Sequence, residues 1–333
     1  DLRELVGAEG EGSQRSHRLL DLVDSTGTDQ GGGHLFMALP GSEQLGEAIA
    51  DTFADGYNVV LLENHGIAAG AGDLLSAFQR LETLDFCART ELKAHALGPI
   101  NTLTEAQLLP FDAQHNLLPE FAPGWHSSRE RELRQEMVEI VRRACERYLM
   151  ISTEGVVSAR LDEHSFLITP TGLDRGNLEI EDIVLIQDGQ RERDKLPSRS
   201  VRLHAAIYAM HPDVNCVITA QSPNILAYAI THGHFDTRTI PESYILLRDV
   251  PMIPYGAQFK EPQRVAEALC DRSPVLLIQN DAVLTTGRTI LQAFDRLEVV
   301  EFSARALIDT ALLGPHVPIG DVQLADLIEA FLS

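Results

Sequence analysis

One internal repeat limits the folds open to this 333-residue chain more than any other feature of its sequence. Residues 77–82 (AFQRLE) return as residues 293–298 (AFDRLE), and at the same offset residues 97–99 (LGP) return as residues 313–315. No gap interrupts the match between these segments. Self-similarity at a constant spacing indicates repeated copies of one structural unit. We therefore predict that the chain holds two copies of one module.

The two copies differ in completeness. We interpret residues 127–333 as a complete module and residues 1–115 as a partial one that keeps only the latter half. Residues 116–126 form the predicted linker, because prolines are frequent around them and helical periodicity is lost. The Gly-rich residues 1–33 are predicted to be loop or fragmentary structure.

Hydrophobic periodicity predicts alternating strands and helices in both parts. Short turns between the middle strands favour antiparallel pairing. The predicted strands are 35–40, 58–62, 158–161, 166–169, 183–187, 215–219 and 275–279. The predicted helices are 43–54, a segment capped by Asp73, a segment capped by Ser127 and Ser128, 201–210, 226–231 and 290–312.

Charge and cysteine content exclude several functional classes. The formal net charge is −22, so the chain repels phosphate backbones and nucleic acid is not an expected partner. No apolar run is long enough to predict a membrane-spanning helix. The cysteines lack CxxC spacing and are interpreted as buried thiols of a cytoplasmic protein. They are Cys87, Cys145, Cys216 and Cys270.

Four segments of the second copy resemble the class II aldolase/adducin family. They are residues 153–160 (TEGVVSAR), 166–172 (FLITPTG), 195–198 (KLPS) and 212–215 (PDVN). In the first copy, residues 62–66 (LENHG) are similar to the family's strand-end turn. The resemblance implies an α/β fold, a three-layer α/β/α sandwich with a central, mostly antiparallel sheet, here duplicated. It also implies self-association into a homodimer or tetramer.

The resemblance implies zinc or another divalent metal held by three histidines, with a glutamate as acid and base. The metal acts as a Lewis acid that stabilises negative charge on a substrate oxygen. The family's ligand positions fall on Thr219, Gln221 and Asp281, and its glutamate falls on Ser200. These side chains make a weak zinc site. We therefore predict no metal in the second copy and no cofactor for the chain unless the first copy is active.

The phosphate side of the family site is better preserved. The resemblance assigns phosphate binding to Gly155, Ser158, Thr171, Gly172, Ser198 and Arg199. Backbone N–H groups of such turns bind anions, and an arginine can bind one bidentately. In the alternative interpretation, the two glycines only form tight turns and Arg199 is a solvated charge.

Two further residues keep a family role open. Tyr244 matches a tyrosine that donates a proton across a subunit boundary, although it can equally serve interface packing. His65 keeps the third metal-ligand position in the first copy. A turn histidine held by hydrogen bonds is the alternative interpretation of His65.

Three hypotheses about function follow. The first is a non-catalytic protein, in the manner of adducin, that serves assembly or binds a small anion or phosphorylated sugar. The second is a metal-dependent sugar-phosphate aldolase or epimerase whose active site lies in the first copy, around His65. The third is a metal-free enzyme that uses Tyr244 and Arg199.

Overall fold

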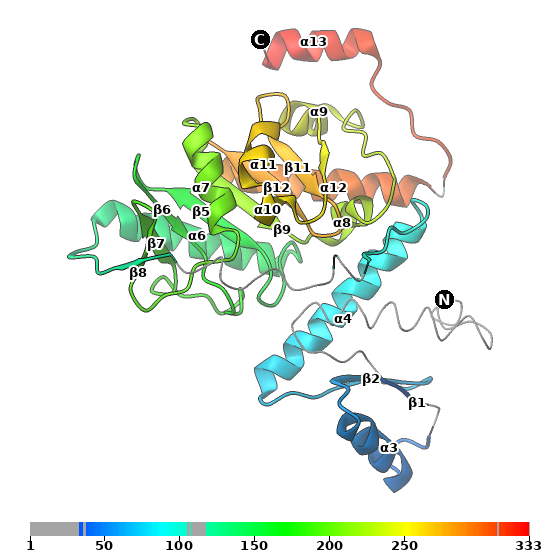
Figure 1. Ribbon diagram of the computed structural model, residues 1–333. Helices are drawn as coiled ribbons and strands as arrows, with labels where there is room; N and C mark the ends of the chain where they lie inside the picture. The colour runs from blue at the N-terminus through cyan, green and yellow to red at the C-terminus, as the bar shows by residue number, and fades with distance from the viewer. Residues whose placement is uncertain (1–32, 36–37, 105–106, 108–117, 312, 333) are drawn as a thin grey trace. The chain divides into compact units, whose positions relative to one another are not determined.

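The computed structural model describes residues 33–35, 38–104, 107, 118–311 and 313–332 (Figure 1). The chain divides into two compact units, residues 1–89 and residues 90–333. Helix α4 (Leu74–His95) runs across this division. The division therefore lies earlier in the chain than the boundary at residue 115 that the sequence suggested.

The first unit contains a small three-stranded sheet in its described part. Strand β1 (Gly33–Leu35) pairs in parallel with β2 (Val59–Leu62), and β2 pairs antiparallel with β3 (Gly66–Ala69). Helix α3 (Glu43–Ala54) connects β1 to β2. The predicted cap of α4 is confirmed, because Asp73 Oδ1 accepts a hydrogen bond from the Ser76 backbone N–H at 2.9 Å.

The second unit is built on a nine-stranded mixed sheet in the order β10-β11-β12-β9-β5-β6-β7-β8-β4. All neighbouring strands pair antiparallel except β10 with β11 and β4 with β8. The strands are β4 (Glu120–Phe121), β5 (Val156–Arg160), β6 (Ser165–Ile168), β7 (Val184–Gln187), β8 (Gln190–Glu192), β9 (Cys216–Ala220), β10 (Met252–Ile253), β11 (Val275–Ile278) and β12 (Ala282–Gly287).

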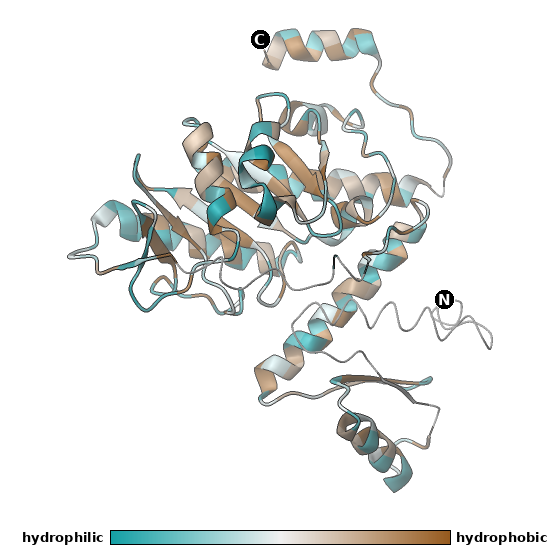
Figure 2. Ribbon diagram, in the orientation of Figure 1, coloured by the Kyte–Doolittle hydropathy of each residue, from teal (hydrophilic) through white to brown (hydrophobic). Residues whose placement is uncertain are grey.

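Helices cover both faces of this sheet. On one face, α7, α10 and α11 enclose the main hydrophobic core with alternate strand residues such as Val217 and Leu284. On the other face, α6, α8 and α12 pack against the central strands (Figure 1). Figure 2 shows the apolar character of these strands. The helices are α6 (Ser128–Glu146), α7 (Val201–Met210), α8 (Pro223–Ala229), α9 (Pro241–Leu247), α10 (Ala257–Lys260), α11 (Pro262–Ala268), α12 (Ile290–Ala311) and α13 (Asp321–Phe331).

Several predictions from the sequence need correction. The predicted linker contains β4, which pairs with β8 at the sheet edge. The strand expected at 35–40 ends at Leu35 in β1, with residues 36 and 37 outside the described part. The helix expected at 226–231 begins at Pro223, because proline suits the first helical position. Of the four cysteines predicted to be buried, only Cys216 is buried, Cys87 and Cys145 are half-buried, and Cys270 is exposed. Of the loop predicted for residues 1–33, residues 1–32 lie outside the described part, and Gly33 begins β1.

A strand–turn–strand–helix segment occurs in each unit with the same spacing. Strand β2 precedes β11 by 216 residues at both ends, and α4 precedes α12 by the same 216 residues at both ends. Each hairpin turn has an asparagine in the left-handed conformation, with φ of 54° at Asn64 and at Asn280. Within the described part of the chain, no helix combines the length and apolar character needed to cross a bilayer.

Candidate functional site

The predicted metal positions meet at one end of three adjacent strands. Strand β9 ends at Ala220, so Thr219 is its last residue but one and Gln221 is the first residue beyond it. Val156 pairs with Thr219, which places Glu154 beside Gln221 just beyond the ladder. Asp281 immediately precedes β12 on the other side of β9. The sheet therefore gathers these polar side chains although they lie far apart in the sequence.

A buried chain of hydrogen bonds begins at Thr219. The Thr219 hydroxyl lies 3.4 Å from Nε2 of His204, and Nδ1 of His204 lies 2.7 Å from the Ser158 hydroxyl. The Ser158 hydroxyl also lies 2.6 Å from the Tyr208 hydroxyl. Burial lowers the pKa of His204 to about 3, so its imidazole is neutral. The Ser158 hydroxyl is thus engaged inside the protein, apart from the other predicted phosphate-binding groups.

Asp281 is held by a residue that the sequence did not single out. Its Oδ2 accepts a hydrogen bond from Nε2 of Gln258 at 2.7 Å. The pKa of Asp281 is raised to about 6, mainly by desolvation and further by the charge of Glu154. The Arg199 charge and the Gln258 hydrogen bond oppose this rise. Gln258 lies on the four-residue helix α10, which is too short to give a periodic signal.

Two amide oxygens near Asp281 are buried without a hydrogen-bond partner among the described residues. They are Oε1 of Gln221 and Oε1 of Gln258. Gln258 is 3 % exposed. Because buried polar groups in folded proteins are almost always paired, each of these orphaned acceptors calls for a donor.

The predicted phosphate turns lie next to each other. Pro170 and Pro197 form an antiparallel bridge, and the Thr171 N–H donates to the Leu196 carbonyl at 3.0 Å. This pairing brings Thr171 and Gly172 close to Ser198 and Arg199. Gly172 has φ of 72°, with open space where a Cβ would lie. Gly172 is also exposed, so the turn leaves its backbone accessible.

A buried arginine holds these turns, and no pattern in the sequence pointed to it. The Arg175 guanidinium donates to the Gly155 carbonyl at 2.8 Å, the Leu173 carbonyl at 2.8 Å and the Pro170 carbonyl at 3.0 Å. Burial lowers the pKa of Arg175 to about 10, which leaves it charged near neutral pH. Gly155 has φ of 88°, and a Cβ there would lie 2.8 Å from Met150. Arg175 and Gly155 therefore shape the loop.

Arg199 is the exposed cation beside these turns. Its guanidinium lies 5.8 Å from the ring centroid of Phe259 on α10. Its charge also acts on Asp281 and Tyr255. Ser200 is the N-cap of α7, but its side chain makes no capping hydrogen bond. Arg199 thus stands between the phosphate turns and the cluster around Asp281.

A family model described as Class II Aldolase and Adducin N-terminal domain matches residues 13–92 and 135–308. This chain belongs to the class II aldolase and adducin family. L-fuculose phosphate aldolase of Escherichia coli K12 is 30 % identical over 188 residues, covering 54 % of this chain and 84 % of that protein. Methylthioribulose-1-phosphate dehydratase of Xanthomonas campestris is 29 % identical over 195 residues, covering 54 % and 89 %.

Solved structures show the same fold. YgbL from Escherichia coli superposes with a TM-score of 0.55 and 25 % identity, covering 60 % of this chain and 98 % of that chain. An L-fuculose 1-phosphate aldolase superposes with a TM-score of 0.55 and 22 % identity, covering 62 % and 98 %. The α/β fold predicted from the class II aldolase resemblance is therefore confirmed.

The side chains at the family's metal position do not fit a three-histidine zinc site. Thr219 offers a hydroxyl, Gln221 a neutral amide and Asp281 one carboxylate, and none offers the imidazole that zinc prefers. The nearby Arg199 guanidinium adds positive charge. Among the described residues, no three His, Cys, Asp or Glu side chains are placed to share a metal ion.

Tyr244 does not join this cluster, and His65 belongs to the first unit while the cluster belongs to the second. His65 is an exposed residue in the turn between β2 and β3 of the first unit. Tyr244 lies on α9, which packs against α12, whereas Arg199 precedes α7 on the other face of the sheet. Within one chain, Tyr244 and Arg199 therefore do not form the metal-free catalytic pair considered from the sequence.

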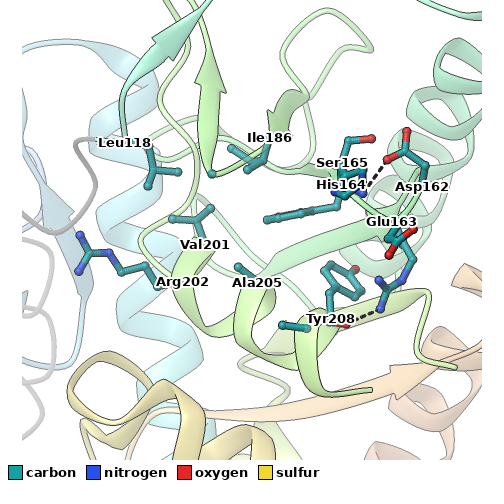
Figure 3. A pocket seen from close by; sticks show the side chains of 14 residues that line it. Leu118, Asp162, Glu163, His164, Ser165, Ile186, Val201, Arg202, Ala205 and Tyr208 are labelled. Carbon is teal, nitrogen blue, oxygen red and sulfur yellow. Dashed lines mark hydrogen bonds between the residues drawn. The ribbon is translucent and has the colours of Figure 1, made fainter. Parts of the chain in front are cut away.

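A separate cavity of about 220 Å³ lies between α7 and the β5–β6 hairpin (Figure 3). Phe166, Ile186 and Val201 form its apolar wall, while Asp162 and His164 lie at its rim. None of the predicted site residues lines this cavity. The cavity is therefore distinct from the cluster at the end of β9.

Proposed function

We propose that residues 127–333 form a metal-free class II aldolase-like module that binds a small phosphorylated ligand instead of cleaving it. The observation that carries this proposal is the donor set at the family's metal position, Thr219, Gln221 and Asp281. Without a Lewis acid, an enediolate oxyanion at this place would lie near a carboxylate and amide oxygens that repel it. Ser200, at the position of the family glutamate, cannot replace a proton-transferring carboxylate near neutral pH.

The phosphate end of the ligand is assigned to the two paired turns. Thr171, Gly172 and Ser198 supply backbone and hydroxyl donors, and Arg199 supplies the charge-assisted contact. Gly155 holds the adjoining loop through Arg175. The relatives named above act on L-fuculose phosphate and methylthioribulose 1-phosphate, so a phosphorylated sugar is the ligand class that we propose.

Binding of inorganic phosphate tests this assignment. Calorimetric titration in the presence of a chelator should show binding to the native chain and about a tenfold weaker affinity in Arg199→Ala, because a charge-assisted contact is lost. The matched control is Arg202→Ala, which removes an exposed arginine three residues further along and should leave phosphate affinity unchanged.

Two results would overturn the proposal. One is equal phosphate affinity in Arg199→Ala and the native chain. The other is one zinc ion per chain in elemental analysis, together with loss of that zinc on Gln221→Ala or Asp281→Ala. Either result would place the anion elsewhere or restore metal chemistry to the second unit.

We also infer that residues 1–115 are a partial copy of the module formed by residues 127–333. The constant spacing of β2 and α4 from β11 and α12 supports this inference, as does the family match to both residues 13–92 and 135–308. Two modules in each chain would let a homodimer imitate a ring of four. Sedimentation of the purified chain tests the dimer, and a monomer at all concentrations would contradict it.

His65 keeps a second candidate function open, a metal-dependent aldolase or epimerase site in the first unit. The supporting observation is that His65 retains an exposed imidazole in the turn that matches residues 279–281. Zinc bound by the native chain and lost in His65→Asn would favour this candidate. Zinc content that does not change in His65→Asn would remove it.

A further inference from the structure

The end of β9 carries more hydrogen-bond acceptors than the protein itself satisfies. Gln221 Oε1 and Gln258 Oε1 are both buried and unpaired among the described residues, and the Asp281 carboxylate receives one amide hydrogen bond. Since Nε2 of Gln258 is fixed on Asp281, the oxygen of the same planar carboxamide lies beside that carboxylate. The orientation of the Gln258 carboxamide follows from its chemistry, because the flipped carboxamide would place its oxygen against the Asp281 carboxylate, and both are acceptors.

We propose that Gln221, Gln258 and Asp281 form a hydroxyl-binding subsite that accepts hydrogen bonds from a polyhydroxylated ligand, at the position where the family would hold a metal. This proposal rests on the proposed function, because the phosphate held near Arg199 would be the other end of the same ligand. The subsite requires that this ligand carry hydroxyl donors on the carbons furthest from the phosphate.

The chemistry of the cluster favours hydroxyl groups over a divalent cation. A hard cation such as Mg²⁺ or Ca²⁺ is held mainly by carboxylates, and a neighbouring guanidinium repels it. Here Asp281 and Glu154 supply the negative charge, and the Arg199 charge acts on the same Asp281 carboxylate. Sugar hydroxyls suit a mixture of amide, carboxylate and guanidinium groups because each hydroxyl both donates and accepts.

The subsite attracts the opposite part of a ligand hydroxyl from the part that a metal ion attracts. A metal attracts the lone pairs of ligand oxygens and stabilises an oxyanion, whereas the acceptors at Gln221, Gln258 and Asp281 attract O–H hydrogens and repel an oxyanion. The ligand is therefore held as a neutral polyol. A hydroxamate that imitates the enediolate should gain no affinity over a polyol of similar size.

A pair of phosphates with equal chain length isolates the hydroxyl contribution. Ribitol 5-phosphate and pentyl phosphate share five carbons and a phosphate, but only the first carries hydroxyl donors. Calorimetry with chelator present should show about tenfold tighter binding of ribitol 5-phosphate, as expected for a few net hydrogen bonds. Gln258→Met should reduce this difference to about twofold, while the affinity for inorganic phosphate stays unchanged.

The choice of variants separates binding from folding. Gln258→Met keeps the side-chain length but removes both the unpaired buried acceptor and the amide donor to Asp281, so unchanged affinity for inorganic phosphate shows that the variant is folded. Gln221→Met is the second test variant and should show the same loss of preference for hydroxyls. Gln190→Met, at an exposed position of the β7–β8 hairpin, is the matched control and should keep the preference.

The outcomes distinguish the subsite from the proposed function. Equal affinity for ribitol 5-phosphate and pentyl phosphate, with both weakened by Arg199→Ala, would overturn the subsite and leave phosphate binding standing. Stabilisation by Mg²⁺ or Ca²⁺ alone that disappears in Gln258→Met would overturn it in favour of a cation site. Failure of inorganic phosphate and both organic phosphates to bind would overturn both proposals.

Discussion

The matching helices α4 and α12 have nearly the same apolar pattern but very different surroundings. Phe78 on α4 is 53 % exposed, whereas its counterpart Phe294 on α12 is fully buried. Leu74 is 87 % exposed and its counterpart Ile290 is 3 % exposed. In the second unit, α12 packs against β9, β12, α6, α8 and α9. The described part of the first unit contains, besides α4, a three-stranded sheet and the helix α3.

One face of α4 is nevertheless buried, as the matching face of α12 is. Leu84 is buried against Val59 of β2, and its counterpart Val300 is buried in the second unit. In the first unit, the β2–β3 hairpin covers the face of α4 that carries Leu84. In the second unit, elements more distant in the sequence also cover the other face of α12. A pattern of apolar residues specifies a helix locally, but its burial depends on partners elsewhere in the chain.

The largest difference is expected for the paired phenylalanines. Phe294→Ala should lower the free energy of unfolding by about 3–5 kcal/mol, because it removes a fully buried ring and leaves a cavity. Phe78→Ala should cost under about 1 kcal/mol, as is usual for exposed side chains. Urea unfolding of both variants measures the difference. Equal costs would show that α4 is covered in solution.

The turn asparagines give a smaller difference. Asn280→Ala should cost about 2–3 kcal/mol, since alanine is strained at φ of 54° and the two hydrogen bonds with Asn101 are lost. Asn64→Ala should cost about 1 kcal/mol from backbone strain. Glycine variants separate the two causes in urea unfolding. Asn64→Gly should be close to neutral, and an equally neutral Asn280→Gly would contradict a role for the Asn101 contacts.

The residues after these asparagines are expected to differ in pH dependence. The pKa of Asp281 is about 6 in the folded protein, above the value of about 3.9 for an unfolded aspartate. The protonated carboxyl therefore stabilises the fold fully below about pH 4, and this stabilisation is lost as pH rises through 6. At pH 7.5, Asp281→Asn should be more stable than the native chain by about 1–3 kcal/mol.

Unfolding at pH 3.5 and at pH 7.5 measures this effect. The advantage of Asp281→Asn should vanish at the lower pH, where the aspartate is neutral in both states. His65→Asn changes the matching residue of the exposed turn in the first unit and should alter stability at pH 7.5 by under about 0.5 kcal/mol. An advantage for Asp281→Asn that persists at pH 3.5 would rule out titration as its cause.

The smallest effect is expected at the start of α4. Leu74→Glu should change the free energy of unfolding by under about 0.5 kcal/mol, because the leucine is almost fully exposed. The measurement is thermal unfolding combined with sedimentation. A loss above about 2 kcal/mol, or a change in mass, would show that another surface covers this position.

The local elements were the most predictable part of the fold. Helix α7 was predicted with its observed ends, and the β2 and β11 strands were predicted to within one residue. Strand β12 was missed because residues 282–287 (AVLTTG) follow a turn and carry polar threonines that are buried only by the sheet. Edge strands β4 and β10 are too short to give a periodic signal.

The candidate site was predictable only in part. The resemblance supplied Thr219, Gln221 and Asp281, and the structure places them at one end of adjacent strands. Gln258 and Arg175 lie on segments without periodicity, so their contacts with Asp281 and Gly155 could not be predicted. Ser158 was predicted to bind phosphate, yet its hydroxyl is engaged with His204 and Tyr208.

The sequence by itself determined the first strand, the turn and the helix of residues 59–95 and of residues 275–311, because apolar spacing and a turn asparagine act between near neighbours in the chain. Only the tertiary structure decided that α12 is buried while much of α4 is exposed, and which polar groups meet at the end of β9. Burial and pairing of those groups depend on strands and helices that are distant in sequence, and their packing sets the desolvation and hydrogen bonding of each side chain.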